Sequence, residues 1–135
     1  MKQKKAIIDT YETLYDVDIV VANRYVTLEK LQKLYTYNDG VVLDNYIIDA
    51  MSTATIVKRI SDNKTCILIK DNHDSKTKSI DKKVDRINTI AHESLHAVFY
   101  LYENIMDQKL CACSQEPACY LIGYIAACVY KTLIK

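Results

Sequence analysis

The sequence predicts an α+β fold in which a small antiparallel or mixed sheet packs on two core helices. Short runs of β-branched and apolar residues lie in the first half of the chain. Two long segments with helical patterning lie in the second half. The 135 residues, half of them apolar, suffice for one hydrophobic core, and no repeat or composition shift divides them. We therefore expect a single domain over residues 1–135.

Three runs predict the strands of the sheet. Residues 17–22 are β-prone, and residues 53–60 and 65–70 are β-branched or apolar. The polar residues 61–64 between the last two runs are typical of a hairpin turn. We expect these two runs to pair as antiparallel neighbours.

The segments beside these strands predict one short helix and two connections. Thr27 offers a hydroxyl N-cap to a helix over the next two turns, and Asn38-Asp39-Gly40 follows with turn chemistry. The apolar positions of this helix are Leu28, Leu31, Leu34 and Tyr35. Residues 41–51 are apolar but fit no single element. A polar, lysine-rich loop over residues 71–79 carries His73, which we expect to be solvated.

The strongest helical pattern spans residues 81–106. Its apolar stripe recurs at spacings of three and four and consists of Val84, Ile87, Ala91, Leu95, Val98, Tyr102 and Ile105. A break over residues 107–114 precedes a last helix, which begins near Gln115 with Ser114 as N-cap and Pro117 in its first turn. Residues 117–130 carry no charge, and this run is too short to span a bilayer, so we expect a buried core helix.

Charge and cysteine content exclude several classes of protein. With 18 basic and 17 acidic side chains, the net charge of +1 indicates neither nucleic acid nor an anionic membrane as a partner. The basic start is followed by an apolar run too short for a secretory signal, so we predict a cytoplasmic protein. The five cysteines are odd in number and lack paired C-x-x-C spacing, which predicts free thiols.

Residues 92–96 of the long helix form an H-E-x-x-H motif, which we interpret as a zinc site. Residues four apart project from one face of a helix, so the imidazoles of His92 and His96 can bind one ion. Glu93 lies one step round the helix, near the open coordination position. There it can act as general base and take a proton from the water on the metal. The apolar residues 97–102 that follow strengthen this interpretation, because histidines in an apolar stretch need a polar partner.

A hydrolytic zinc site needs a third protein ligand, and Glu116 is our candidate. It opens the last helix, where the positive end of the helix dipole keeps a carboxylate ionised. Gly123, two turns further on, would let the last helix approach the motif helix closely. The rival ligands are the nearby thiolates of Cys111, Cys113 and Cys119.

With these two segments the chain resembles the gluzincins, zinc peptidases with H-E-x-x-H on one helix and a glutamate ligand on a later helix. It is most similar in style to the ImmA/IrrE-like peptidases and to small proteins of phages and mobile elements. The matching segments are His-Glu-Ser-Leu-His at 92–96 and Glu-Pro-Ala-Cys-Tyr-Leu-Ile-Gly-Tyr-Ile at 116–125. Both lie in the C-terminal third of the chain.

The resemblance implies His92, His96 and Glu116 as zinc ligands and Glu93 as the base. It also implies a zincin-like sheet whose edge strand pairs with an extended peptide substrate, and we place that strand at residues 65–70.

The resemblance leaves the oxyanion-stabilising residue open. Many gluzincins carry an aspartate four residues after the ligand glutamate, where this chain has Tyr120. The hydroxyls of Tyr120, Tyr124 and Tyr100 are the candidate donors to an oxyanion, and we place Tyr120 first.

The predicted function is that of a zinc metallopeptidase, a hydrolase that cleaves a peptide bond in an intracellular protein partner. The alternative is a zinc-stabilised protein-interaction module of phage or mobile-element type, which acts on a host protein without catalysis. Glu93 favours catalysis, because a structural zinc site has no use for a base.

Overall fold

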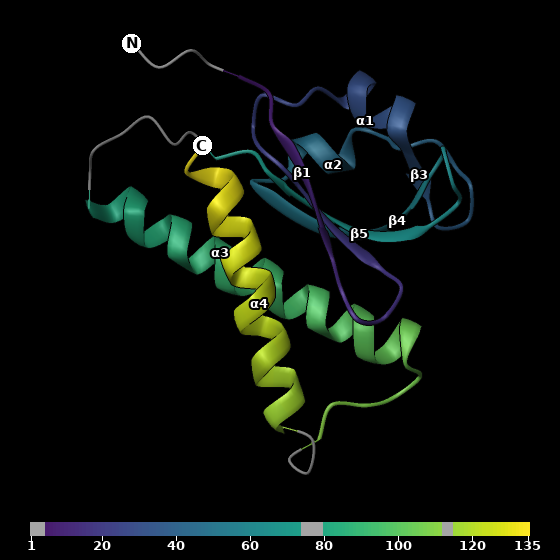
Figure 1. Cartoon of the computed structure of the whole chain (residues 1–135). Helices are drawn as coiled ribbons and strands as arrows, with labels where there is room; N and C mark the ends of the chain where they lie inside the picture. Colours follow the sequence, from purple (N-terminus) through teal and green to yellow (C-terminus); the bar gives the residue numbers. More distant parts are fainter. Residues whose placement is uncertain (1–4, 74–79, 112–114) are drawn as a thin grey trace.

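The computed structural model describes residues 5–73, 80–111 and 115–135. It shows a five-stranded mixed sheet with two long helices on one face and two short helices on the other (Figure 1). The predicted α+β class is confirmed in this form.

The strand order across the sheet is β1-β2-β5-β4-β3. The strands are β1 (Ile8–Glu12), β2 (Asp18–Ala22), β3 (Tyr35–Tyr37), β4 (Ser52–Arg59) and β5 (Thr65–Asp71). β2 and β5 run parallel, and the other neighbours are antiparallel. The three predicted strands are confirmed as β2, β4 and β5, with the hairpin turn between the last two. The sequence patterns do not indicate β1 or β3, because β1 alternates poorly and β3 has only three residues.

The prediction that residues 65–70 form an edge strand is wrong. β5 lies at the centre of the sheet, paired with β2 on one side and β4 on the other. Its nearly unbroken run of buried residues is typical of a strand that is covered on both faces. The edge strands are β1 and β3.

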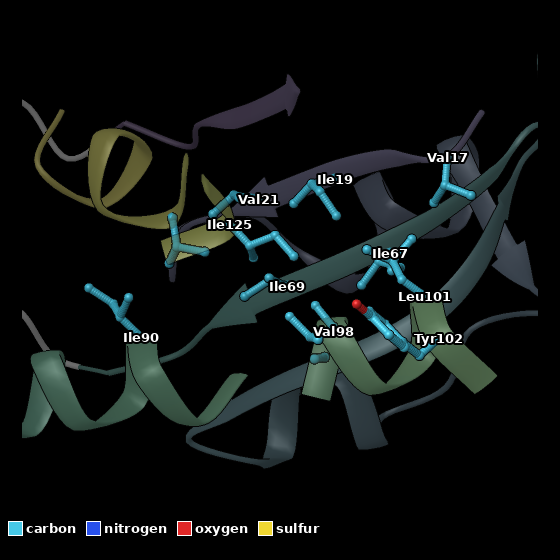
Figure 2. Packing of buried hydrophobic residues seen from close by; sticks show 13 residues of the cluster. Val17, Ile19, Val21, Ile67, Ile69, Ile90, Val98, Leu101, Tyr102 and Ile125 are labelled. Carbon is cyan, nitrogen blue, oxygen red and sulfur yellow. The ribbon is translucent and has the colours of Figure 1, made fainter. Parts of the chain in front are cut away.

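Alternate residues of the central strands supply two separate cores. Ile19 and Val21 of β2 and Ile67 and Ile69 of β5 face the two long helices (Figure 2). Val20, Leu68 and their neighbours face the short helices α1 (Leu28–Leu34) and α2 (Tyr46–Asp49). The predicted N-cap of α1 is confirmed, because Thr27 Oγ1 accepts a hydrogen bond from the backbone N–H of Lys30 at 3.2 Å.

The motif helix α3 (Ile80–Tyr100) continues into a π-helical turn, Leu101–Ile105. The predicted stripe is wrong in its first half, because Val84, Ile87 and Leu95 are exposed by 56%, 68% and 44%. The buried side of the helix consists of Ile90, Glu93, Ser94, Ala97, Val98, Leu101 and Tyr102. The first turns of α3 project past the sheet (Figure 1), and their apolar side chains are exposed.

The last helix, α4 (Gln115–Leu133), crosses α3 and packs against β1 and β2 (Figure 1). Its start is confirmed, whereas the Ser114 cap lies outside the described residues. Its core contacts come from the face of Ile125 and Val129. Gly123 is exposed, and a Cβ added to it would meet no atom within 4 Å, so its predicted role in a close helix approach is wrong. Among the described helices, none is long and apolar enough to cross a membrane.

Candidate metal centre

The two motif histidines face each other on the exposed side of α3. Their Nε2 atoms are 3.1 Å apart, and their rings meet edge to face with centroids 4.7 Å apart. This follows from the helix itself, because side chains at i and i+4 lie one turn above each other. The His92 side chain is 64% exposed, so the pair is open to an ion from solvent.

The distance between the two nitrogens fits one zinc ion. Zinc binds imidazole nitrogen at about 2.0–2.1 Å, and two such nitrogens at a tetrahedral angle stand about 3.3 Å apart. The observed 3.1 Å is close to this value. The same distance suits a hydrogen bond between the rings when one Nε2 carries a proton and the other does not, so the pair is compatible with both states.

Glu93 is the buried member of the motif. It is only 4% exposed, and its Oε1 lies 3.8 Å from His92 Nε2 and accepts a hydrogen bond from Ser52 Oγ at 3.1 Å. One ligand atom from each of His92, Glu93 and His96 lies within 4.8 Å of the others. The sequence does not indicate this role of Ser52, because a serine at the start of a strand carries no signal of such a contact.

The structure does not bring Glu116 into this cluster. Among the described residues, the group able to hold an ion comprises His92, Glu93 and His96 only. Glu116 is exposed in the first turn of α4, on the side of that helix away from the core. As a third ligand, Glu116 therefore stays a prediction that the present geometry does not support.

Of the rival cysteine ligands, Cys111 and Cys119 are not part of the cluster. Cys111 forms a disulfide bond, which corrects the prediction that all five thiols are free. Cys119 is free and exposed on α4, whereas Cys66 and Cys128 are free and buried. Cys113 lies outside the described residues.

Of the three candidate tyrosines, only Tyr100 lies beside the histidine pair. Its ring stacks on that of His96 with a centroid distance of 6.3 Å. Burial raises the pKa of Tyr100, and Tyr46 and Glu93 raise it further, so its hydroxyl keeps its proton and can donate.

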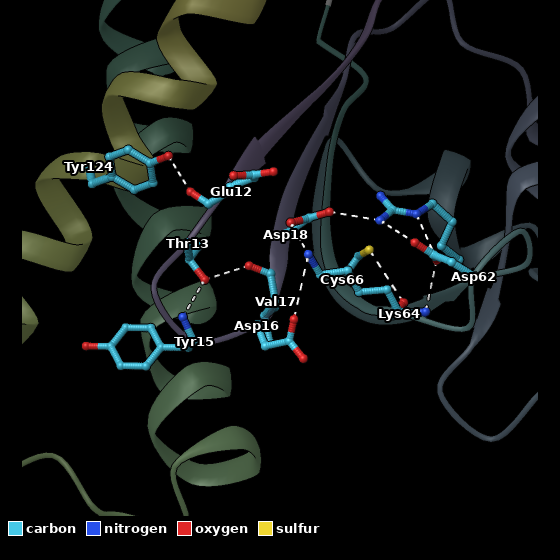
Figure 3. Close-up of polar contacts among 11 residues, drawn as sticks. Glu12, Thr13, Tyr15, Asp16, Val17, Asp18, Asp62, Lys64, Cys66 and Tyr124 are labelled. Atoms are coloured by element: carbon cyan, nitrogen blue, oxygen red, sulfur yellow. Dashed lines mark hydrogen bonds and ion pairs between the residues drawn. The ribbon is translucent and has the colours of Figure 1, made fainter.

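The other two tyrosines lie on α4 against the turn between β1 and β2. Tyr124 donates a hydrogen bond to the carbonyl of Glu12 at 2.5 Å (Figure 3). Tyr120 is 77% exposed. Both tyrosines line one surface depression, together with Pro117 and Leu14. The first choice of Tyr120 as oxyanion donor is thus not supported by its position, and of the three candidates Tyr100 lies nearest to the histidine pair.

The prediction that His73 is solvated is wrong, because both of its ring nitrogens have side-chain partners. His73 Nδ1 is 2.7 Å from Asp71 Oδ1, and His73 Nε2 is 3.4 Å from the hydroxyl of Thr89 on α3. Asp71 and Ser52 are cross-strand partners in the β4–β5 ladder. Two neighbouring strand residues are therefore linked to α3. Ser52 donates to Glu93 directly, and Asp71 is linked to Thr89 through His73.

Comparisons of this chain with protein-family models, with curated proteins and with solved structures found no match. The assignment of function therefore rests on the residues and geometry of the chain itself.

Proposed function

We propose that this protein is a zinc-dependent peptidase with a zincin-like site, in which His92 and His96 hold the ion and Glu93 is the general base. The observation that carries the proposal is the facing pair of Nε2 atoms at 3.1 Å with a buried carboxylate 3.8 Å away. Two imidazoles are two of the three protein ligands that a catalytic zinc site uses, and the adjacent carboxylate is the kind of base that acts on the metal-bound water.

When bound, zinc supplies Lewis acidity, which polarises a carbonyl group and lowers the pKa of water. The chain supplies the remaining functions. Glu93 accepts the proton of the attacking water, and Ser52 orients that carboxylate by a hydrogen bond. Tyr100, whose ring stacks on that of His96, would donate its hydroxyl proton in a hydrogen bond to the oxyanion that develops on the substrate.

The open edge beside this site favours an extended peptide as substrate. The backbone N–H of Arg59 donates to the carbonyl of Lys64, and the N–H of Asn72 donates to the carbonyl of Met51. The backbone N–H and C=O groups of the odd-numbered residues of β4 therefore point toward β5. The backbone groups of Ser52, Ala54 and Ile56 therefore point to the other side of β4, where β3 covers only Val57 to Arg59. A substrate strand can pair there, starting at the residue that contacts Glu93.

The coordination sphere of this proposal is incomplete in the present geometry. Glu116 would have to move with the start of α4 to serve as third ligand. The metal analysis below distinguishes Glu116 from any other third ligand.

Metal analysis tests the proposal directly. Protein purified without chelators should contain about one equivalent of zinc. His92→Ala should lose it, whereas His73→Ala, which removes a histidine outside the pair, should keep it. Zinc near zero in the wild-type protein, even after incubation with zinc, would exclude the assignment. Retention by Glu116→Ala would show that Glu116 is not the third ligand.

Catalysis is tested separately with Glu93→Gln, which keeps the size of the side chain and removes the base. We expect retained zinc and at least a hundredfold loss of peptidase activity on a library of unstructured peptides. Equal activity in variant and wild type would refute the role of Glu93.

A zinc-stabilised interaction module is the second candidate, and one observation favours it. Ile80, Val84, Ile87 and Leu95 form an exposed apolar stripe along α3, on the helix that carries the histidine pair. Zinc binding without peptidase activity in either wild type or Glu93→Gln would put this function first.

A further inference from the structure

A second polar site lies where the end of β5, the first half of α3 and the end of α4 meet. A cavity of about 90 Å³ opens there. Four of its lining residues carry a full positive charge, namely Lys5, Arg24, Arg86 and Lys135. Asp71 is the acidic residue in the lining, and His73 completes the polar set.

The negative charge in this lining is already engaged. Asp71 is 6% exposed, and its Oδ1 accepts hydrogen bonds from the backbone N–H and from Nδ1 of His73 at 3.1 and 2.7 Å. Lys135 is held by Asp9, which is not part of the lining, at 2.7 Å. The carboxylates that the structure describes around the cavity are thus committed to His73 and Lys135.

Arg86 is the cation that projects into the cavity from α3. Its side chain is half-buried on α3 and makes no hydrogen bond or ion pair with any residue that the structure describes. A guanidinium has five donors in a fixed fork, and burying it among other cations is unfavourable unless an anion is present. This arrangement therefore calls for an anionic ligand.

We propose that this cavity binds a phosphate group, with Arg86 as its ligand and the positive charges of the surrounding side chains as electrostatic support. Arginine forks match the oxygen geometry of phosphate, and several cations around one small volume favour a divalent over a monovalent anion. The volume admits an ion of this size but little more. The ligand is therefore inorganic phosphate or the terminal group of a small phosphomonoester.

The site is independent of the proposed zinc chemistry, although it lies on the same helix. Thr89, which His73 contacts, precedes Glu93 by one helical turn. Phosphate binding needs neither His92 nor His96, so failure of the zinc assignment leaves this proposal standing.

The test is calorimetric titration of the full chain with inorganic phosphate at constant ionic strength, with acetate as the monovalent comparison. We expect saturable phosphate binding that is weakened at least tenfold in Arg86→Gln, which removes one charge and its donors. The matched control is Lys33→Gln, which removes the same charge from the exposed end of α1 and should bind as the wild type does. A parallel titration with glycerol phosphate distinguishes a phosphomonoester from the free ion.

A second readout uses the wild-type protein alone, in case Arg86→Gln fails to fold. Nuclear magnetic resonance should show phosphate-dependent shifts concentrated at the amides of Asn72, His73 and Arg86, and none at Lys33. Absence of phosphate binding at 10 mM (about ten thousand times the concentration at which a micromolar ligand half-saturates its site) would overturn the proposal. Binding that Arg86→Gln leaves unchanged, or shifts spread over the whole surface, would overturn it equally.

Discussion

Two carboxylates in this protein are buried to the same degree but are compensated very differently. Asp18 is 3% exposed and Glu93 is 4% exposed. Asp18, at the start of β2, accepts from Arg59 and Lys64, each at 2.9 Å (Figure 3). Among the residues that the structure describes, Glu93 contacts the neutral hydroxyl of Ser52 and an imidazole nitrogen 3.8 Å away.

Under the proposed function, the difference would distinguish a structural carboxylate from a chemical one. The Asp18 cluster is complete, since Arg59 is also paired with Asp62 at 2.9 Å and these pairs hold the pKa of Arg59 above its ordinary value. Such a cluster fixes the β4–β5 turn to β2 and needs nothing more. Glu93 lacks a cation, and a metal ion on the adjacent histidines would provide one. The predictions below test this contrast.

The largest expected effect is on folding stability at Asp18. Asp18→Asn leaves Arg59 and Lys64 without their shared partner and should lower the free energy of unfolding by about 3 kcal/mol. Glu93→Gln, measured in chelator, should change it by less than about 0.5 kcal/mol or raise it, because a poorly compensated charge is removed. Urea unfolding of both variants gives the comparison. Equal losses would mean that Glu93 is as structural as Asp18.

Lys70 extends the comparison of buried charges to a cation. It is 1% exposed, and its Nζ donates to the neutral oxygens of Asn23 and Asn72. Burial lowers the pKa of Lys70 from 10.5 to about 8. Between these values the unfolded chain binds more protons than the folded one, so stability should rise with pH, by about 3 kcal/mol in total.

The measurement is the difference between wild type and Lys70→Met in unfolding free energy from pH 7.5 to 10.5. Taking the difference removes the contribution of the tyrosines, which titrate in the same range. A difference that does not vary with pH would show that the folded Lys70 amine stays protonated throughout.

Zinc bound at His92 and His96, beside Glu93, should stabilise the protein. At a zinc concentration of one hundred times the dissociation constant, the free energy of unfolding should rise by about 2.7 kcal/mol. His92→Ala should show no such gain, and His73→Ala should show nearly all of it. Thermal unfolding with and without chelator measures both. A similar gain in all three proteins would place the ion elsewhere.

The smallest effect concerns the hydrogen bond from Ser52. Ser52→Ala should lower the free energy of unfolding by about 1–2 kcal/mol, because a buried carboxylate loses its hydroxyl donor. In the Glu93→Gln background the same substitution should cost about 1 kcal/mol less. Additive effects in this double-mutant cycle would show that the hydroxyl does not act on Glu93.

Local signals in the sequence predicted much of the fold. The β-branched runs became β2, β4 and β5, and Thr27 caps α1 as expected. These elements are specified within a few residues, by side-chain branching, turn residues and a hydroxyl at the helix start. β1 and β3 were beyond such signals, because β1 alternates poorly and β3 has only three residues.

The faces of the helices could not be predicted in the same way. α3 carries two apolar stripes, and periodicity does not distinguish the one that contacts the sheet from the one that projects past it. The same limit applies to α4, where Glu116 and Gly123 turned out to lie on the outer side. Which face is buried depends on the path of the whole chain.

The sequence by itself determined the histidine pair, since helical geometry brings His92 and His96 together whatever surrounds the helix. Only the tertiary structure decided the neighbours of that pair. The β4–β5 register sets Ser52 beside Asp71, and the packing of α3 on that strand pair brings Ser52 to Glu93 and Asp71, through His73, to Thr89. The two contacts with α3, Ser52 to Glu93 and His73 to Thr89, join residues 41 and 16 positions apart, and no local pattern encodes such separations.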